Sequence, residues 1–113
     1  IEHVGLCCGI KDSYGDAKAM EEISRILKIG GSAIISVPYG RTAIVRQEHR
    51  IYDSNSLAEL AKPLSLARTE FYQYSSGKWL RCSQERAERA ASFYIPLKFH
   101  STAFACLLLK KKH

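Results

Sequence analysis

An apolar strand that directly follows an amphipathic helix is the feature of this sequence that most restricts its fold. Between residues 16 and 27, apolar side chains recur at steps of three and four, which predicts a helix with one apolar face. We expect Gly30 to end this helix, because glycine readily adopts the left-handed conformation that closes one. Residues 32–37 are apolar or small and partly β-branched, and Pro38 ends the run. Such a run is typical of a strand covered on both faces, so the sequence predicts a layered α/β fold.

Asp16 stands at the start of the predicted helix and has two interpretations. Aspartate is a common cap of a helix amino terminus, where its carboxylate accepts a backbone hydrogen bond. Alternatively, Asp16 faces a cofactor or an acceptor together with the neighbouring Tyr14. We favour the cap, because the preference of aspartate for that position is strong.

The rest of the chain alternates between further helices and strands. Asp53 is a candidate cap for a short helix, which Pro63 ends. A segment rich in aromatic and β-branched residues then predicts a strand, and a Ser-Gly turn follows it. The expected elements are a polar loop at 39–50, a helix at 54–62, a strand at 66–74, a turn at 75–78, a polar surface helix at 83–91 and a last strand at 102–109.

Length and composition indicate a single domain over residues 1–113. Hydrophobic residues make up 46% and charged residues 25% of the chain, which is ordinary for a globular protein. Lys+Arg 17 against Asp+Glu 11 leaves a net charge of +6, but these positive residues are scattered apart from Lys110, Lys111 and Lys112. This scatter favours a solvated surface, so nucleic acid is not the expected partner.

The cysteines and the apolar runs argue against a metal centre and a membrane span. Cys7, Cys8, Cys82 and Cys106 lack the spacing of zinc and redox sites, so we predict reduced thiols in a cytoplasmic protein. His3 with Cys7 and Cys8 offers metal-binding atoms, but their spacing fits no standard site and no metal is expected. No apolar run reaches the ~18 residues that span a bilayer, so no membrane partner is expected.

Several segments resemble the second half of a class I S-adenosylmethionine (SAM)-dependent methyltransferase of the type-11-like kind. The resemblance extends to about Tyr74, and its combination of motifs is more specific than any one of them. Ile29 departs from the family pattern, which usually has proline there. The segments are IEHVGL at 1–6, YGD at 14–16, RILKIGG at 25–31, VPYG at 37–40, HRIYD at 49–53 and SL at 56–57.

The resemblance implies a partial Rossmann-like methyltransferase sheet with flanking helices. The family has a seven-stranded sheet with helices on both sides and an antiparallel last strand. On that template residues 32–37 are the fifth strand, 66–74 the sixth and 102–109 the seventh. The seventh strand is then expected between the other two and antiparallel to them.

The resemblance also implies a function and one severe departure. The chain is expected to be the C-terminal half of an enzyme that moves a methyl group from SAM to a small-molecule acceptor. The glycine-rich turn and the acid that hold SAM in the family are not found in the sequence, so the chain alone should bind SAM weakly. The alternative is a non-catalytic interaction module, in which the edge of residues 32–37 pairs with a second copy or with a complementing N-terminal half.

The resemblance places two residue groups around SAM. Glu2 and His3 are the expected catalytic residues, next to the transferred methyl, and His3 is either a general base for an acceptor hydroxyl or a residue that holds its loop by a hydrogen bond. Gly5 and Tyr14 are the expected cofactor-binding residues.

The expected substrate-binding residues are Tyr39, His49, Arg50 and Tyr52. Arg50 is suited to an anionic acceptor such as a phosphate or a carboxylate, although an exposed basic loop is the interpretation we slightly favour. Three later aromatic residues, Tyr72, Tyr74 and Trp79, could form an aromatic wall at the site. We favour packing within or at the edge of the sheet, because aromatic residues are common in strands.

Overall fold

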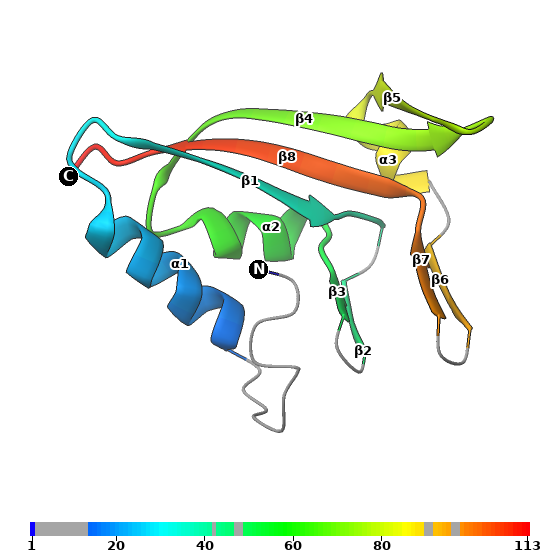
Figure 1. The fold of residues 1–113 in the computed structure, drawn as a ribbon, viewed down its shortest axis with the longest axis horizontal. Coiled ribbons are helices and arrows are strands. Elements are labelled where there is room, and N and C mark those ends of the chain that lie inside the picture. The colour runs from blue at the N-terminus through cyan, green and yellow to red at the C-terminus, as the bar shows by residue number, and fades with distance from the viewer. Residues whose placement is uncertain (2–13, 42, 47–48, 90–91, 96–97) are drawn as a thin grey trace.

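The fold has two layers, a four-stranded sheet and a set of helices that cover one of its faces (Figure 1). The computed structural model describes residues 1, 14–41, 43–46, 49–89, 92–95 and 98–113. The elements are α1 (Gly15–Ile26), β1 (Ser32–Pro38), β2 (Ile44–Arg46), β3 (His49–Ile51), α2 (Ser54–Ala61), β4 (Ser65–Ser75), β5 (Lys78–Cys82), α3 (Gln84–Arg89), β6 (Ser92–Ile95), β7 (Lys98–Ser101) and β8 (Ala103–Lys110). None of the helices in the described ranges is long and apolar enough to cross a membrane.

The sheet has the strand order β1-β8-β4-β5, and each neighbouring pair is antiparallel. β8 therefore lies between β1 and β4, which run parallel to each other. The prediction that the last strand inserts between the two earlier ones, in the opposite direction, is confirmed. The mixed α/β class is confirmed as well.

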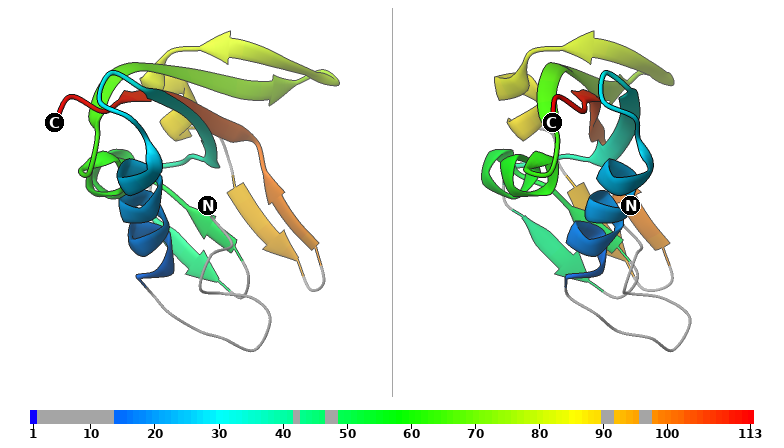
Figure 2. Two further views of the ribbon diagram at one scale, coloured as in Figure 1. Left: turned by 60° about the vertical axis from the view of Figure 1, so that its left-hand side comes forward. Right: turned by 90° about the vertical axis from the view of Figure 1, so that its left-hand side faces the viewer.

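The expectation that residues 32–37 are covered on both faces is wrong. Along β1, Val37 is 1% exposed while Ile34 is 74% exposed, so the two faces of the strand differ sharply. The reason is that the described helices pack against one face of the sheet only. The turned views in Figure 2 show α1, α2 and the hairpins β2–β3 and β6–β7 on that same side.

The hydrophobic core fills the space between the sheet and these helices. Alternate residues of β8 face it, because successive side chains of a strand point to opposite faces. Met20 from α1, Leu60 from α2 and Ala87 from α3 meet the strand there. The core residues on β8 are Ala103, Ala105, Leu107 and Leu109, each 0% exposed.

The predicted helix ends are right at one position and wrong at two. Asp53 forms a capping box at α2, in which its Oδ1 accepts from the Ser56 backbone N–H at 2.8 Å. Gly30 has the expected left-handed φ of +86°, but it does not end α1, which stops at Ile26 with Leu27 as an extended C-cap. Asp16 does not cap α1 either: the N-cap is Tyr14, and Asp16 lies within the first turn of the helix.

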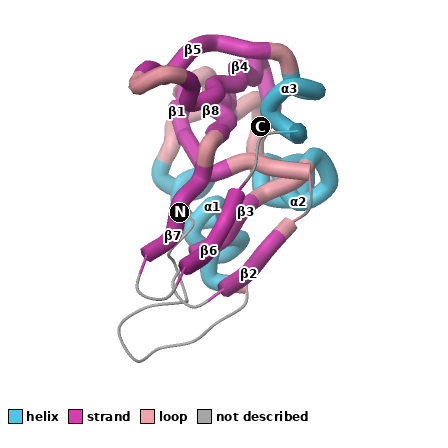
Figure 3. The backbone as a smooth tube through the Cα atoms, turned by 90° about the vertical axis from the view of Figure 1, so that its right-hand side faces the viewer, coloured by secondary structure: helices cyan, strands magenta, loops and turns pink. Residues whose placement is uncertain are grey.

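Short strands form where the sequence predicts none. The 39–50 loop contains the hairpin β2–β3, and the region after residue 78 contains β5 and the hairpin β6–β7 (Figure 3). The expected turn at 75–78 is confirmed, and it joins β4 to β5. Its two central residues, Ser76 and Gly77, both have positive φ, at 50° and 81°. Two positive φ angles give the turn twist that suits a tight hairpin.

Truncating β8 on its two faces should have unequal costs. We expect Leu107→Ala to lower the free energy of unfolding by about 2 to 5 kcal/mol, because it leaves a cavity in the core. Leu108→Ala, on the open face of the same strand, is the matched control and should cost about 1 kcal/mol. Urea denaturation followed by circular dichroism measures both, and equal costs would contradict the one-sided core.

Candidate functional site

The candidate site lies at the carboxyl end of β1, where two distant segments meet. The chain leaves the strand at Tyr39 and returns beside it at Tyr52, forming a parallel bridge. The Gly40 N–H donates to the Tyr52 carbonyl at 2.9 Å, and the Tyr52 N–H donates to the Pro38 carbonyl at 3.0 Å. Residues predicted to bind substrate from both segments are therefore brought together.

Asp16 links the amino end of α1 to this junction. Its Oδ2 accepts a hydrogen bond from the Tyr52 hydroxyl at 2.8 Å and lies 3.7 Å from Arg50 Nε. The side chains of Arg50 and Asp16 are only 3% and 16% exposed. The interpretation of Arg50 as part of an exposed basic loop is therefore wrong, because the β2–β3 hairpin returns the chain into the protein at this residue.

This arrangement sets the charge environment of Arg50. A guanidinium binds phosphate or carboxylate through charge-assisted hydrogen bonds. In this structure the guanidinium lies beside the Asp16 carboxylate, which compensates its charge. Asp16, which the sequence suggested only as an alternative to the cap, thus belongs to the polar cluster of the candidate site.

Tyr39 is held by a second polar group, formed with α3. Its side chain is 0% exposed, and its hydroxyl donates to Glu88 Oε1 at 2.8 Å and accepts from Gln84 Nε2 at 3.2 Å. Burial, and next the bond to Glu88, raise the pKa of Tyr39 to about 12. The hydroxyl therefore stays protonated at neutral pH and acts as a hydrogen-bond donor.

Sequence reasoning did not find Gln84 and Glu88. It assigned residues 83–91 to a polar helix that covers the surface. The available signal was their spacing, because residues four apart lie on one face of a helix. Their partner Tyr39, more than forty residues earlier, could not be read from that spacing.

Asp53 fixes the loop between the hairpin and α2. Besides capping α2, its Oδ2 accepts from the Ala43 N–H at 3.2 Å. The pKa of Asp53 lies below its usual value, chiefly because of the backbone hydrogen bond from Ser56. A carboxylate held in this way keeps the segment after Tyr52 in place.

The remaining predicted residues are only partly placed. Tyr14 is 71% exposed at the start of α1, two residues before Asp16. Glu2, His3 and Gly5 lie outside the described residues, and for His49 the structure describes the backbone in β3 but not the side chain. Their roles stay predictions.

The later aromatic residues pack together on the open face of the sheet. Tyr72 stacks on Phe104 with ring centroids 4.9 Å apart, and Trp79 meets Phe104 edge-on at 5.0 Å. Tyr74 contacts Trp79 at 5.4 Å. The packing interpretation is confirmed.

Metal-ligating side chains do not gather in groups of three or more in the part of the chain that the structure describes. His3, Cys7 and Cys8, the candidates considered from the sequence, lie outside that part.

Removing the charge of Asp16 should destabilise the protein. We expect Asp16→Asn to lower the free energy of unfolding by about 2 kcal/mol, because it leaves the buried Arg50 charge less well compensated. Glu22→Gln on the same helix is the control; Glu22 pairs with Arg25 at 2.7 Å, but both side chains are exposed and little change is expected. Equal losses in urea denaturation would count against a supporting role for Asp16.

Comparison with known proteins places the chain in a family but not with a characterised relative. One family model matches residues 1–94. No curated protein and no solved structure matches the chain. Because the matched segment covers most of the 113 residues, the chain belongs to the family described as "Caenorhabditis protein of unknown function, DUF268".

Proposed function

We propose that this chain supplies the C-terminal, acceptor-binding half of a SAM-dependent methyltransferase. The observation that carries the proposal is the order β1-β8-β4, with β8 antiparallel between two parallel strands. The methyltransferase family that the sequence resembles arranges its fifth, seventh and sixth strands in this way. The motifs at 25–31 and 37–40 flank β1 in the chain as they flank the fifth strand of that family.

The described residues do not by themselves fit SAM. No glycine-rich turn joins a strand to a helix within the described ranges: Gly15 begins α1, Gly30 and Gly31 precede β1, Gly40 is a single glycine after β1, and Gly77 lies in the β4–β5 turn. Such a turn lets the backbone approach a cofactor closely. Binding of SAM therefore needs residues beyond those described, and the contribution of this chain is to the acceptor.

The acceptor side of the proposal rests on the cluster at the end of β1. Arg50, together with Asp16 and Tyr52, places a cation and hydrogen-bonding groups at this end of the sheet, and an anionic acceptor is oriented by them once it displaces part of the cover over Arg50, which is 3% exposed. Tyr39, whose hydroxyl donates to Glu88, fixes the exit of β1. His3 remains the proposed base for an acceptor hydroxyl. The free thiols of Cys82 and Cys106 support a cytoplasmic location.

Calorimetry with SAM tests this proposal. We expect no measurable binding to this chain and clear binding to a longer version that carries an amino-terminal methyltransferase half. A longer version whose glycine-rich turn is replaced by valines is the control and should lose binding. Absence of binding in every version would remove the proposal.

A second candidate function is an interaction module that pairs through β1. In the described part of the chain, β1 forms one edge of the sheet. Residues 32–38 contain no charged side chain, and Ile34 is 74% exposed. Uncharged edge strands with exposed apolar residues tend to pair with a further strand.

Sedimentation velocity tests this second candidate. We expect a concentration-dependent dimer, which Ile34→Lys should abolish by placing a charge on the edge strand. Leu80→Lys is the matched control, because Leu80 is 53% exposed on β5, the opposite edge. A folded monomer at all concentrations would exclude pairing through β1.

A further inference from the structure

Lysines from three separate segments gather at the amino end of β1, opposite the candidate site. The Gly30 N–H donates to the Lys111 carbonyl at 2.7 Å, and the Lys111 N–H donates to the Gly31 carbonyl at 3.0 Å. A small cavity of about 120 Å³ is lined by residues 62–65 on one side and residues 111–113 on the other. Figure 1 shows the C-terminus beside the loop between α1 and β1. The lysines of this basic end are Lys28, Lys62, Lys110, Lys111 and Lys112.

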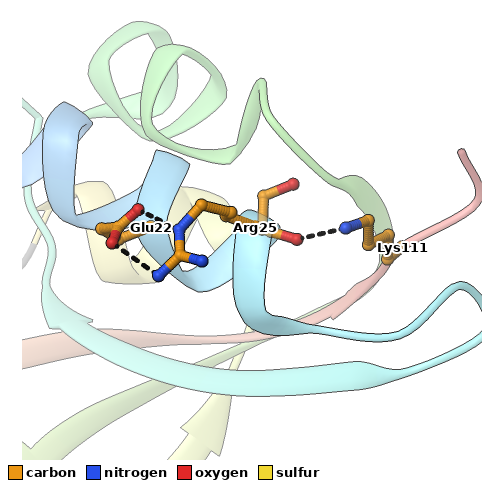
Figure 4. Close-up of polar contacts among 4 residues, drawn as sticks. Glu22, Arg25 and Lys111 are labelled. Atoms are coloured by element: carbon orange, nitrogen blue, oxygen red, sulfur yellow. Dashed lines mark hydrogen bonds and ion pairs between the residues drawn. The ribbon is translucent and has the colours of Figure 1, made fainter.

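Hydrogen bonds fix these segments against each other. Lys111 Nζ donates to the Ser24 carbonyl in the last turn of α1 at 2.6 Å (Figure 4). The Ser24 hydroxyl donates to the Pro63 carbonyl at 3.2 Å. The last turn of α1 thus joins the end of β8 to the end of α2, so the basic end is a preformed surface and not a loose tail.

The positive charge of this end is largely uncompensated. Lys62 pairs with Glu59 at 3.2 Å, and within the described ranges the other four lysines form no ion pair with a carboxylate. Five lysines and one glutamate leave a local net charge of +4, out of +6 for the whole chain. The sequence shows only the run 110–112; the fold adds Lys28 and Lys62 to it.

Exposed aliphatic side chains lie among these lysines. Ile26 is 67% exposed and Ile29 is 72% exposed, and Ile29 follows Lys28 directly in the loop before β1. Leu66, just beyond the cavity, is 47% exposed. A nucleic acid in water offers phosphates to the lysines but little to exposed isoleucines. A bilayer surface offers both anionic headgroups and an apolar layer beneath them.

We propose that the basic end binds the surface of a membrane that contains anionic lipids. The lysines attract the headgroups, and Ile29 enters the boundary between headgroups and acyl chains. The sequence led us to expect no membrane partner because it has no apolar run long enough to span a bilayer. Binding to a membrane surface needs no such run. The candidate site, at the carboxyl end of β1, lies at the far end of the strand from this surface. The cytoplasmic leaflet carries the negative charge that this surface requires.

Vesicle co-sedimentation tests the proposal with the chain as it is. We expect binding to vesicles of equal parts phosphatidylserine and phosphatidylcholine, and none to phosphatidylcholine alone. The combined variant Lys28→Gln, Lys110→Gln and Lys112→Gln should weaken binding roughly a hundredfold, at about fivefold for each lysine. Ile29→Ser should weaken it roughly tenfold, because the headgroup attraction remains.

Two matched control variants distinguish binding through this surface from nonspecific binding through any positive charge or any exposed apolar side chain. Lys78→Gln removes a charge at the β4–β5 turn, and Leu80→Ser removes a leucine that is 53% exposed on β5. Both should bind vesicles as the unchanged chain does, with unchanged circular dichroism. Three results would overturn the proposal. They are equal binding to both vesicle types, no binding to either type, and control variants that weaken binding as much as the basic-end variants do. Release from vesicles by duplex RNA at equal phosphate concentration would assign the surface to nucleic acid instead.

Discussion

The antiparallel pairing of β8 between β1 and β4 is the interaction on which the rest of the structure depends. Leu107 and Leu109 on this strand are fully buried, and helices from three parts of the chain pack over them. β8 pairs at residue 110 with Ser32 and with Ser65, so one strand joins the amino ends of two others. Without β8, β1 and β4 have no strand between them to pair with, and the helices lose the sheet face against which they pack.

The same strand supports the candidate site. The Tyr39 N–H donates to the Ala103 carbonyl at 3.1 Å, which holds the exit of β1 against the start of β8. The Tyr39 ring then packs against Phe71 at a centroid distance of 4.9 Å, and its hydroxyl reaches Glu88. A buried hydroxyl that keeps its partners holds its loop firmly, because leaving them unpaired away from water is costly. These contacts therefore tie the exit of β1 to β8, β4 and α3.

Elements that depend on local signals were predicted well, and those that depend on distant partners were not. Asp53 caps α2 because its partner, Ser56, is three residues away. Asp16 was assigned a cap by the same reasoning, yet its carboxylate accepts from Tyr52, thirty-six residues later. Arg50 looked exposed because the three-residue strands of the β2–β3 hairpin carry too little periodicity to show that the chain turns inward. The packing of the described helices on one face of the sheet had no sequence signal either.

The sequence by itself determined the helix α1, the strands β1, β4 and β8, and the turns that separate them, because hydrophobic periodicity and turn residues act over a few positions. Only the tertiary structure decided which charges stand together. Arg50 became buried beside Asp16, and Lys28 and Lys62 joined the lysines that follow β8. The physical reason is that strand pairing brings together backbone groups far apart in the chain, and the side chains that share a surface follow from that pairing.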